Sequence, residues 1–209
     1  MRLGILGGTF NPIHHGHLRC ALEVQHGLGL DRVDLLPNAI PPHKASPGVS
    51  SANRLAMVQL ACADQPQLGV DDRELQRQGP SYTVDTLADI KAQQPNTQLH
   101  FIIGMDSLQS FPHWHQHQRI LELCHLVVCH RPGYPLQANS NAAQLLAKHQ
   151  INQQQLLQQR HGGICLFAAT ELDIASSRLR AQMAQGLGPD FLLPNSVVNY
   201  IQQNQLYRS

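Results

Sequence analysis

Two stretches of this chain gather residue types that bind anions. Residues 7–17 read GGTFNPIHHGH and place three histidines after a pair of glycines, whereas residues 174–180 read IASSRLR and join two serines to two arginines. Glycines at a turn from strand to helix let main-chain N–H groups approach an anion, and the first turn of a helix adds positive potential. Both stretches therefore contain the residue types that bind phosphate groups.

The first stretch differs from the common nucleotide-binding loops. No glycine in the chain is followed by lysine, and no G-x-G-x-x-G follows the first apolar run. Instead, His14 and His17 have the spacing that puts two rings on one side of a first helical turn. There they can donate hydrogen bonds to phosphoryl oxygens as charge develops in a transition state. A metal site is a weaker alternative, and so is chance in a chain with 13 histidines.

The second stretch is typical of a helix N-terminus, with Ser176 and Ser177 expected at the cap and Arg178 and Arg180 on the first turns. The helix dipole makes cations unfavourable at that end unless an anion is bound. The pattern alone is equally consistent with an ordinary cap and with an anion site.

Short apolar segments alternate with helical periods along the chain. Strands are expected over 2–6, 32–37, 68–71, 99–103, 126–129 and 164–167, and helices over 15–28, 50–63, 82–94, 176–185 and 196–203. This alternation predicts an α/β fold with a doubly wound, mostly parallel sheet that binds ligands outside the carboxyl ends of its strands. The glutamine-rich stretch 136–160 is expected to be a solvated helical cover.

Composition narrows the class of protein. With 209 residues, we expect one domain over 1–209, with the C-terminal helices from about residue 174 packed onto it. A net charge of +1 argues against a broad nucleic-acid footprint, and no apolar run is long enough to span a membrane. Five scattered cysteines without C-x-x-C argue against a disulfide framework and a structural zinc site, and favour a reducing cytoplasm.

From end to end, the chain resembles the bacterial nicotinate-mononucleotide adenylyltransferases, a Rossmann-like family of the nucleotidyltransferase superfamily. The resemblance is carried by H-x-G-H, IASSRLR, PNAIPPHK (37–44), PSYTVDTL (80–87), FIIGMDSL (101–108), FPHWH (111–115), CHRPGY (129–134) and LLPNSVVNYIQQNQLY (192–207). It implies an enzyme of NAD biosynthesis that transfers AMP from ATP to nicotinate mononucleotide, giving deamido-NAD and pyrophosphate. No protein nucleophile is needed for that transfer.

The resemblance also implies roles for individual residues on the ATP side. His14, His17 and Arg180 would carry the catalysis. ATP would be bound by main-chain groups and side chains of Gly8, Thr9, Phe10, Lys44, Gly104, Asp106, Ser176, Ser177 and Arg180, with Asp106 on the adenosine ribose. An ordinary helix N-cap is the alternative role for Asp106, and a solvated surface lysine is the alternative for Lys44. Mg²⁺ would arrive on the ATP phosphates, without a dedicated protein cage.

A second set of residues would bind the acceptor. It comprises Asn38, Thr83, Trp114, His115 and Arg131, with Arg131 on the acceptor phosphate. Trp114 lies among polar neighbours, which favours stacking on a flat ring over a place in the core. The chain departs from the family where Asn11 replaces a frequent Asp, where Ala175 replaces a Ser, and where His115 replaces a frequent aromatic residue.

Of three alternatives to this function, one is excluded and two remain. A class I aminoacyl-tRNA synthetase shares H-x-G-H but needs a lysine-rich second signature and an anticodon domain, which this chain lacks. An adenylyltransferase of the same fold could act on nicotinamide mononucleotide or on phosphopantetheine. A non-catalytic nucleotide-binding module could keep the pocket without turnover.

Overall fold

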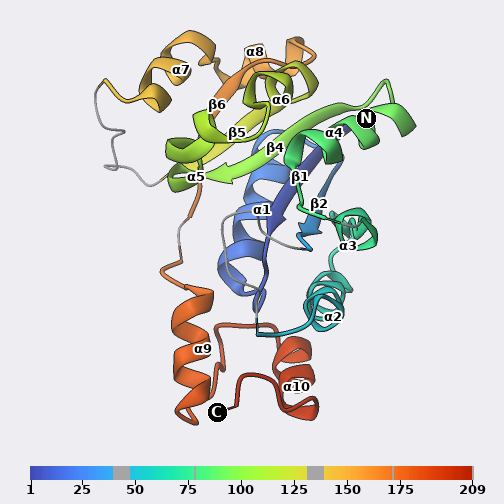
Figure 1. Cartoon of the computed structure of the whole chain (residues 1–209), viewed down its shortest axis with the longest axis vertical. Coiled ribbons are helices and arrows are strands. Elements are labelled where there is room, and N and C mark those ends of the chain that lie inside the picture. Colours follow the sequence, from blue (N-terminus) through green and yellow to red (C-terminus); the bar gives the residue numbers. More distant parts are fainter. Residues whose placement is uncertain (40–47, 78, 131–138, 171, 209) are drawn as a thin grey trace.

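A single parallel sheet forms the centre of the computed structural model, which describes residues 1–39, 48–77, 79–130, 139–170 and 172–208. Its strands are β1 (Arg2–Gly8), β2 (Arg32–Pro37), β3 (Leu68–Val70), β4 (Gln98–Gly104), β5 (His125–His130) and β6 (Ile164–Ala168). They lie in the order β3-β2-β1-β4-β5-β6, and every neighbouring pair is parallel (Figure 1). The predicted doubly wound α/β fold is confirmed.

Helices connect these strands. They are α1 (His15–Gly27), α2 (Ser51–Cys62), α3 (Arg73–Gln76), α4 (Thr83–Gln93), α5 (Met105–Ser110), α6 (His117–Leu123), α7 (Asn141–His149), α8 (Gln153–Gln158), α9 (Ser176–Ala184) and α10 (Asn195–Gln203), with a 3-10 turn η1 at Phe111–His113. The sequence did not predict α3, α5 or α6, because helices of one or two turns are too short to show a helical period.

Alternation along the strands divides the core into two layers. In β1, Leu3 and Ile5 pack on the face covered by α4 and α6, whereas Leu6 packs on the opposite face with α1 and α2. In β4, Phe101 and Ile102 separate in the same way. Successive side chains of a strand point to opposite faces, so each buried strand supplies both layers.

The glutamine-rich stretch forms helices over its described part, as the sequence predicts. Within its described part, α7 and α8 begin at capping side chains, Ser140 and Asn152, which accept hydrogen bonds from Ala143 N–H and Gln155 N–H. Leu156 of α8 is fully buried in the core with α1. The expected solvated helical cover is confirmed for α8, whose other residues are exposed while Leu156 anchors the helix in the core.

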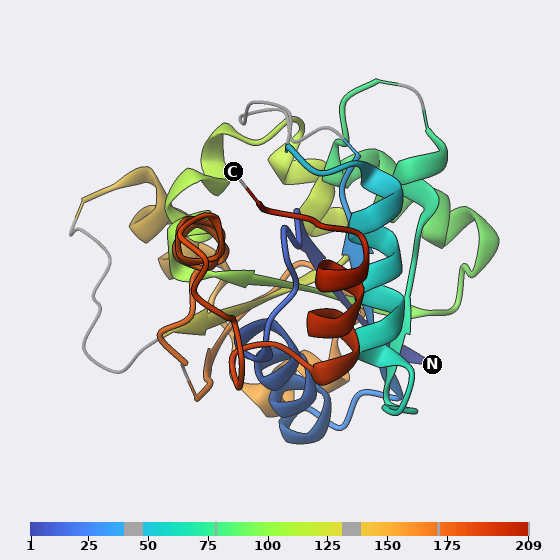
Figure 2. The ribbon, with the colours of Figure 1, turned by 90° about the horizontal axis from the view of Figure 1, so that it is seen from below.

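The two last helices, α9 and α10, lie past the carboxyl end of β1, on opposite sides of it (Figures 1 and 2). Leu179 and Val197 share a buried cluster with Leu18 of α1. Ser196 Oγ also donates to Leu60 O at 3.2 Å, which joins α10 to α2. The single-domain organisation stays a prediction. Among the described helices, none combines the length and apolarity needed to cross a membrane.

The strand order creates a switch point between β1 and β4. From β1 the chain winds outward to β2 and β3, and from β4 it winds the other way to β5 and β6. The loops that leave two such neighbouring strands diverge and leave a crevice at the carboxyl edge of the sheet. The histidine-rich stretch follows β1, while β4 ends at Gly104 and passes directly into α5, whose first turn holds Asp106, so both motifs border this crevice.

Candidate active site

The first loop, residues 8–14, runs from the end of β1 to the start of α1. Phe10 adopts a positive φ of 44° and is almost completely buried. A Cβ on Gly8 would lie 2.9 Å from the Phe10 ring, so only glycine lets the main chain pass over that ring. The sequence therefore builds an open main chain over an aromatic base, where N–H groups of Gly8, Thr9 and Phe10 were expected to line the pocket.

The two motif histidines face each other at the start of α1. Their rings are stacked, with centroids 3.7 Å apart. The main-chain N–H of His14 donates to Nδ1 of His17 at 3.3 Å, so in neutral His17 the proton lies on Nε2. Nδ1 of His14 is buried and has no hydrogen-bond partner in the described part of the chain. Nδ1 of His14 and Nε2–H of His17 can therefore form hydrogen bonds to a ligand.

Both rings are neutral near pH 7. Burial, helped by the neighbouring His15, lowers the pKa of His14 to about 4. Burial and the proximity of His14 hold the pKa of His17 well below its usual value. A polyanion bound beside these rings favours their charged forms, so the pair can take up protons when phosphates bind.

The start of α9 touches the first loop directly. Ser176 Oγ donates to Pro12 O at 2.9 Å, and Arg180 Nη1 donates to Asn11 O at 2.7 Å. These contacts bring the second motif, far along the chain, against the first. His14, His17, Ser176 and Arg180 are therefore gathered around one loop.

The cap predicted for α9 is wrong. Ala175 occupies the N-cap position and offers no side-chain bond, while Ser176 and Ser177 lie inside the first turn. Ser177 is exposed. Arg178 is also exposed and pairs with Asp173 at 3.1 Å, whereas Arg180 reaches the loop. The two arginines of the motif therefore have different surroundings, which the sequence does not distinguish.

Gly104 ends β4 and serves as the N-cap of α5. Asp106 lies in the first turn of that helix with an exposed side chain, so the N-cap alternative for Asp106 is wrong. A Cβ on Gly104 would lie 2.7 Å from Oδ1 of Asp106. Glycine at 104 therefore leaves space for a carboxylate that folds back over the helix start, beside the switch point.

Arg54 is a site residue that sequence reasoning missed. Its side chain is 1% exposed and donates to Thr9 O at 2.7 Å, Asn38 O at 2.8 Å and Ala39 O at 3.3 Å. It thereby ties the loop after β1 to the loop after β2. The available signal was an arginine in line with Met57, Val58 and Ala61 on the buried stripe of α2.

Asn38 follows β2 and is held from both sides. Its N–H donates to Gly8 O at 3.0 Å, and its carbonyl accepts from Arg54. Its side-chain Oδ1 is buried with no hydrogen-bond partner among the described residues. A buried acceptor without a donor is costly, and a ligand that donates to it removes the cost.

Trp114, the residue expected to stack on the acceptor ring, packs beside two phenylalanine rings. Trp114 is half-buried, its ring centroid lies 5.4 Å from that of Phe111 and 6.2 Å from that of Phe101, and its Nε1 donates to Ser110 Oγ at 3.2 Å. The sequence argument that Trp114 lacks apolar neighbours is wrong, because β4 and η1 supply them.

The remaining acceptor candidates in the described chain lie at α4. The exposed His115 ring has its centroid 4.5 Å from that of Tyr82, and Thr83, the next residue, begins α4. The structure therefore brings His115 near Thr83, although they are separated in the sequence. Lys44 and Arg131 lie outside the described residues.

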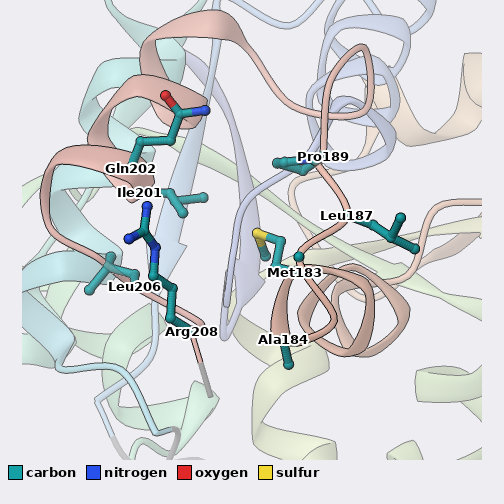
Figure 3. Close-up of a pocket in the computed structure, with 10 residues that line it drawn as sticks. Met183, Ala184, Leu187, Pro189, Ile201, Gln202, Leu206 and Arg208 are labelled. Carbon is teal, nitrogen blue, oxygen red and sulfur yellow. The ribbon is translucent and has the colours of Figure 1, made fainter.

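A hollow of about 450 Å³ lies between α9 and α10, with Met183, Leu187, Ile201 and Leu206 on its walls (Figure 3). None of the predicted site residues in the described chain lines it. Among the described residues, no three His, Cys, Asp or Glu side chains gather as a metal cluster. The donors around the first loop are cationic or N–H groups, which suit phosphate oxygens and a metal carried by the phosphates themselves.

Comparison with known proteins places these features in a family. The family described as Cytidylyltransferase-like matches residues 5–182. The chain is 51% identical over 207 residues to "Probable nicotinate-nucleotide adenylyltransferase" of Aeromonas hydrophila, covering 99% of this chain and 97% of that protein. The protein of the same name from Shewanella pealeana is 44% identical over 208 residues, covering 100% and 96%.

Solved structures show the same fold. Nicotinic acid mononucleotide adenylyltransferase of Plasmodium falciparum, complexed with NaAD, superposes with a TM-score of 0.73 at 16% identity, covering 99% of this chain and 97% of that one. The same protein complexed with APC gives a TM-score of 0.71 at 15% identity, covering 99% and 96%. With identity above 40% over nearly its full length to the curated relatives, this chain belongs to the nicotinate-nucleotide adenylyltransferase family of cytidylyltransferase-like proteins.

Proposed function

We propose that this enzyme transfers the AMP group of ATP to nicotinate mononucleotide, giving deamido-NAD and pyrophosphate in NAD biosynthesis. The observation that carries the proposal is the contact between the first loop and α9, in which Ser176 and Arg180 reach Pro12 and Asn11. It places two imidazoles, a guanidinium and the N-terminus of a nine-residue helix around one main-chain loop. That set of donors fits a triphosphate.

The transfer needs no protein nucleophile. A 5′-phosphate oxygen of nicotinate mononucleotide attacks the α-phosphorus of ATP, forming a new P–O–P bond as the bond to pyrophosphate breaks. The electron pair of the broken bond leaves with pyrophosphate. Catalysis therefore consists of positioning the reactants and neutralising charge, as in phosphoryl transfer generally.

Each of the polar side chains around the loop has a role in this transfer. Nε2–H of His17 is free to donate to an α-phosphate oxygen, because its Nδ1 accepts from the main chain. His14 offers its buried Nδ1 edge beside it. Ser176, Ser177 and Arg180 hold the β- and γ-phosphates, whose charge grows as pyrophosphate departs. Arg54 of α2 holds the loop in place through its hydrogen bond to Thr9 O.

ATP recognition is completed at β4 and by the metal. Gly104 and Asp106 border the switch point, where the Asp106 carboxylate would accept hydrogen bonds from the adenosine ribose. Mg²⁺, bound through the ATP phosphates, supplies further charge neutralisation. Lys44 would add a cation.

The acceptor pocket is built from the second group of residues. Trp114 would stack on the pyridine ring, while Asn38, Thr83 and main-chain N–H groups around His115 would contact the nucleotide, with Arg131 on its phosphate. No Asp or Glu lies between Ser107 and Ile120, so that stretch does not repel a carboxylate. A pocket of donors satisfies both carboxylate oxygens but leaves an amide NH₂ facing a donor, at a cost of about 1–3 kcal/mol.

We infer that the enzyme works in the reducing cytoplasm, because its five cysteines are free thiols. Its substrates are ATP and nicotinate mononucleotide, and neither nucleic acid nor membrane is proposed as a partner.

The direct test is product formation from purified enzyme with ATP and Mg²⁺. Nicotinate mononucleotide, nicotinamide mononucleotide and phosphopantetheine are supplied in parallel, and pyrophosphate and the dinucleotide are both quantified. We expect deamido-NAD with a kcat/KM about tenfold or more above that for the amide. A preference for another acceptor contradicts the proposed substrate, and ATP binding without pyrophosphate release indicates a non-catalytic module.

A further inference from the structure

The segment that follows α10 turns back onto the first loop. Leu206 N–H donates to Ile201 O at 3.0 Å, and Asn204 N–H donates to Tyr200 O at 3.1 Å. Gln205 and Tyr207 then adopt positive φ values of 51° and 63°. Residues other than glycine enter this left-handed region at an energetic cost, so other contacts must hold the segment there.

The contact at the end of this segment is a hydrogen bond to the first loop. The Tyr207 hydroxyl donates to Oδ1 of Asn11 at 2.6 Å, across a separation of 196 residues. Burial raises the pKa of Tyr207, although the cations of Arg180 and Arg54 act in the opposite direction. The phenol therefore keeps its proton near pH 7, and Asn11 supplies the acceptor.

Asn11 is shared between Tyr207 and the site. Its side-chain oxygen accepts from Tyr207, and its main-chain carbonyl accepts from Arg180 at 2.7 Å. Asn11 itself is 6% exposed. Because both oxygens belong to one buried residue, the hydrogen bond from Tyr207 helps to fix the residue whose carbonyl Arg180 contacts.

Arg54 completes the arrangement from the other side. It is buried against three main-chain carbonyl oxygens, and its charge and that of Arg180 are both near enough to affect the pKa of Tyr207. The Tyr207 hydroxyl therefore lies within electrostatic reach of both guanidinium groups, and Asn11 contacts Tyr207 and Arg180.

From this network we propose that Tyr207 is a positioning residue for ATP binding. Its hydrogen bond to Asn11 holds the first loop and Arg180 at the separation that the triphosphate requires, without Tyr207 touching ATP. That the ligand is ATP rests on the proposed function. The hydrogen bond between Tyr207 and Asn11 is observed independently of that function. This role also explains why Asn can replace the frequent Asp at position 11, since both side chains supply an acceptor oxygen.

Tyr200 provides a matched control. Its hydroxyl also donates to an asparagine, Asn53 Oδ1 at 2.9 Å, but that bond joins α10 to α2. We expect Tyr207→Phe to raise the Kd and KM for ATP about three- to tenfold, the range for one lost hydrogen bond, with the KM for nicotinate mononucleotide unchanged. Tyr200→Phe should leave both KM values unchanged. Equal kinetic effects of the two variants would show that Tyr207 acts only by stabilising the fold.

Variants of Asn11 test whether Tyr207 affects ATP affinity through its hydrogen bond to Asn11. Asn11→Asp keeps the acceptor oxygen and should retain ATP affinity, whereas Asn11→Leu should weaken it as much as Tyr207→Phe does. The double variant Tyr207→Phe/Asn11→Leu should be no weaker than Asn11→Leu alone, because both changes remove one hydrogen bond. Additive losses would contradict the proposal.

Calorimetric titration with a non-hydrolysable ATP analogue separates this inference from the proposed function. Binding needs no acceptor and no turnover. A wild-type enzyme that binds the analogue but forms no deamido-NAD overturns the proposed function alone. Unchanged analogue affinity in Tyr207→Phe overturns the positioning role, whatever the reaction is.

Discussion

Two histidine pairs in this molecule share burial and chemistry but differ in place. His14 and His17 stack at the carboxyl edge of the sheet, while His100 and His125 face each other across β4 and β5, with ring centroids 5.6 Å apart. Burial lowers the pKa of His100 to about 4 and also lowers that of His125. Burial and a lowered pKa are therefore common to both pairs.

The difference lies in what surrounds the rings. Hydrogen bonding does not separate the pairs: His125 bonds through both nitrogens, to Gln159 O at 3.0 Å and from Gly163 N at 3.1 Å, but both ring nitrogens of His100, like Nδ1 of His14, have no hydrogen-bond partner among the described residues. Arg180 and the start of α9 lie near the first pair, while strands enclose the second. A perturbed pKa thus identifies a buried group, and only its place beside the switch point identifies a candidate site.

The sharpest way to break this comparison is His17→Ala. We expect kcat to fall by about 10²–10³, the cost of one donor to a developing charge, with little change in melting temperature. His15→Ala, in the same motif, is the control and should retain activity. Initial rates of deamido-NAD formation and a thermal melt measure both. An active His17→Ala enzyme would remove the catalytic role from the edge pair.

The buried pair should instead affect stability in acid. Since the folded pKa of His100 is about 4, below the usual 6.5, the unfolded state binds protons that the folded state does not as the pH falls between these values. The free energy of unfolding should therefore drop, by about 2 kcal/mol from pH 7 to pH 5 for this one group.

His100→Leu should flatten that pH dependence and leave turnover near pH 7.5 intact. Urea unfolding at pH 7 and pH 5 measures the pH dependence of the free energy of unfolding. If the variant keeps the wild-type slope, His100 is not the group that destabilises the fold in acid. If it loses turnover while remaining folded, the buried pair is not separate from the site.

Arg180→Ala tests the cation beside the edge pair. The KM for ATP should rise about tenfold, because one charge-assisted hydrogen bond is lost while the loop N–H groups remain. The KM for nicotinate mononucleotide should change much less. Arg178→Ala, exposed on the same helix, is the control and should behave like the wild type. Equal rises for both substrates in Arg180→Ala would mean that Arg180 is structural.

The smallest expected effect is proton uptake on ATP binding. At pH 6 the edge pair is neutral, and bound phosphates should raise the pKa values of both rings, so a fraction of a proton is taken up per ATP. Calorimetry in buffers of different ionisation enthalpy measures this fraction. His14→Ala should reduce it and His100→Leu should not. Identical uptake in both variants would mean that the protons bind elsewhere.

Much of the fold was predictable because its strands are apolar and bounded by glycine or proline. The strand at 32–37 has the predicted bounds, because Val33, Leu35 and Leu36 mark it as buried even though Asp34 interrupts the apolar run. Segment 105–123 was not predicted, because its short helices depend on the packing of Phe111, Ile120 and Leu121 rather than on periodicity. Local sequence carries no record of such tertiary packing.

The candidate site was predictable where a motif is contiguous. The spacing of His14 and His17 predicts their common side of the helix, and the structure shows their rings stacked. Arg54 and Tyr207 were missed because their partners are distant in the chain, at Thr9 and Asn11. A satisfied buried arginine looks like an ordinary helix residue until its carbonyl partners are placed around it.

The first loop is far along the chain from the residues that contact it, and this distance affects how the protein folds during synthesis. Pro12 meets Ser176 across 164 residues, Asn11 meets Arg180 across 169, and Asn11 meets Tyr207 across 196. A ribosome adds roughly 5–20 residues per second, so the loop emerges roughly 10–40 s before these partners exist. A nascent chain can pair β1 with β2 during that interval, but it completes its phosphate loop only after Tyr207 has been made.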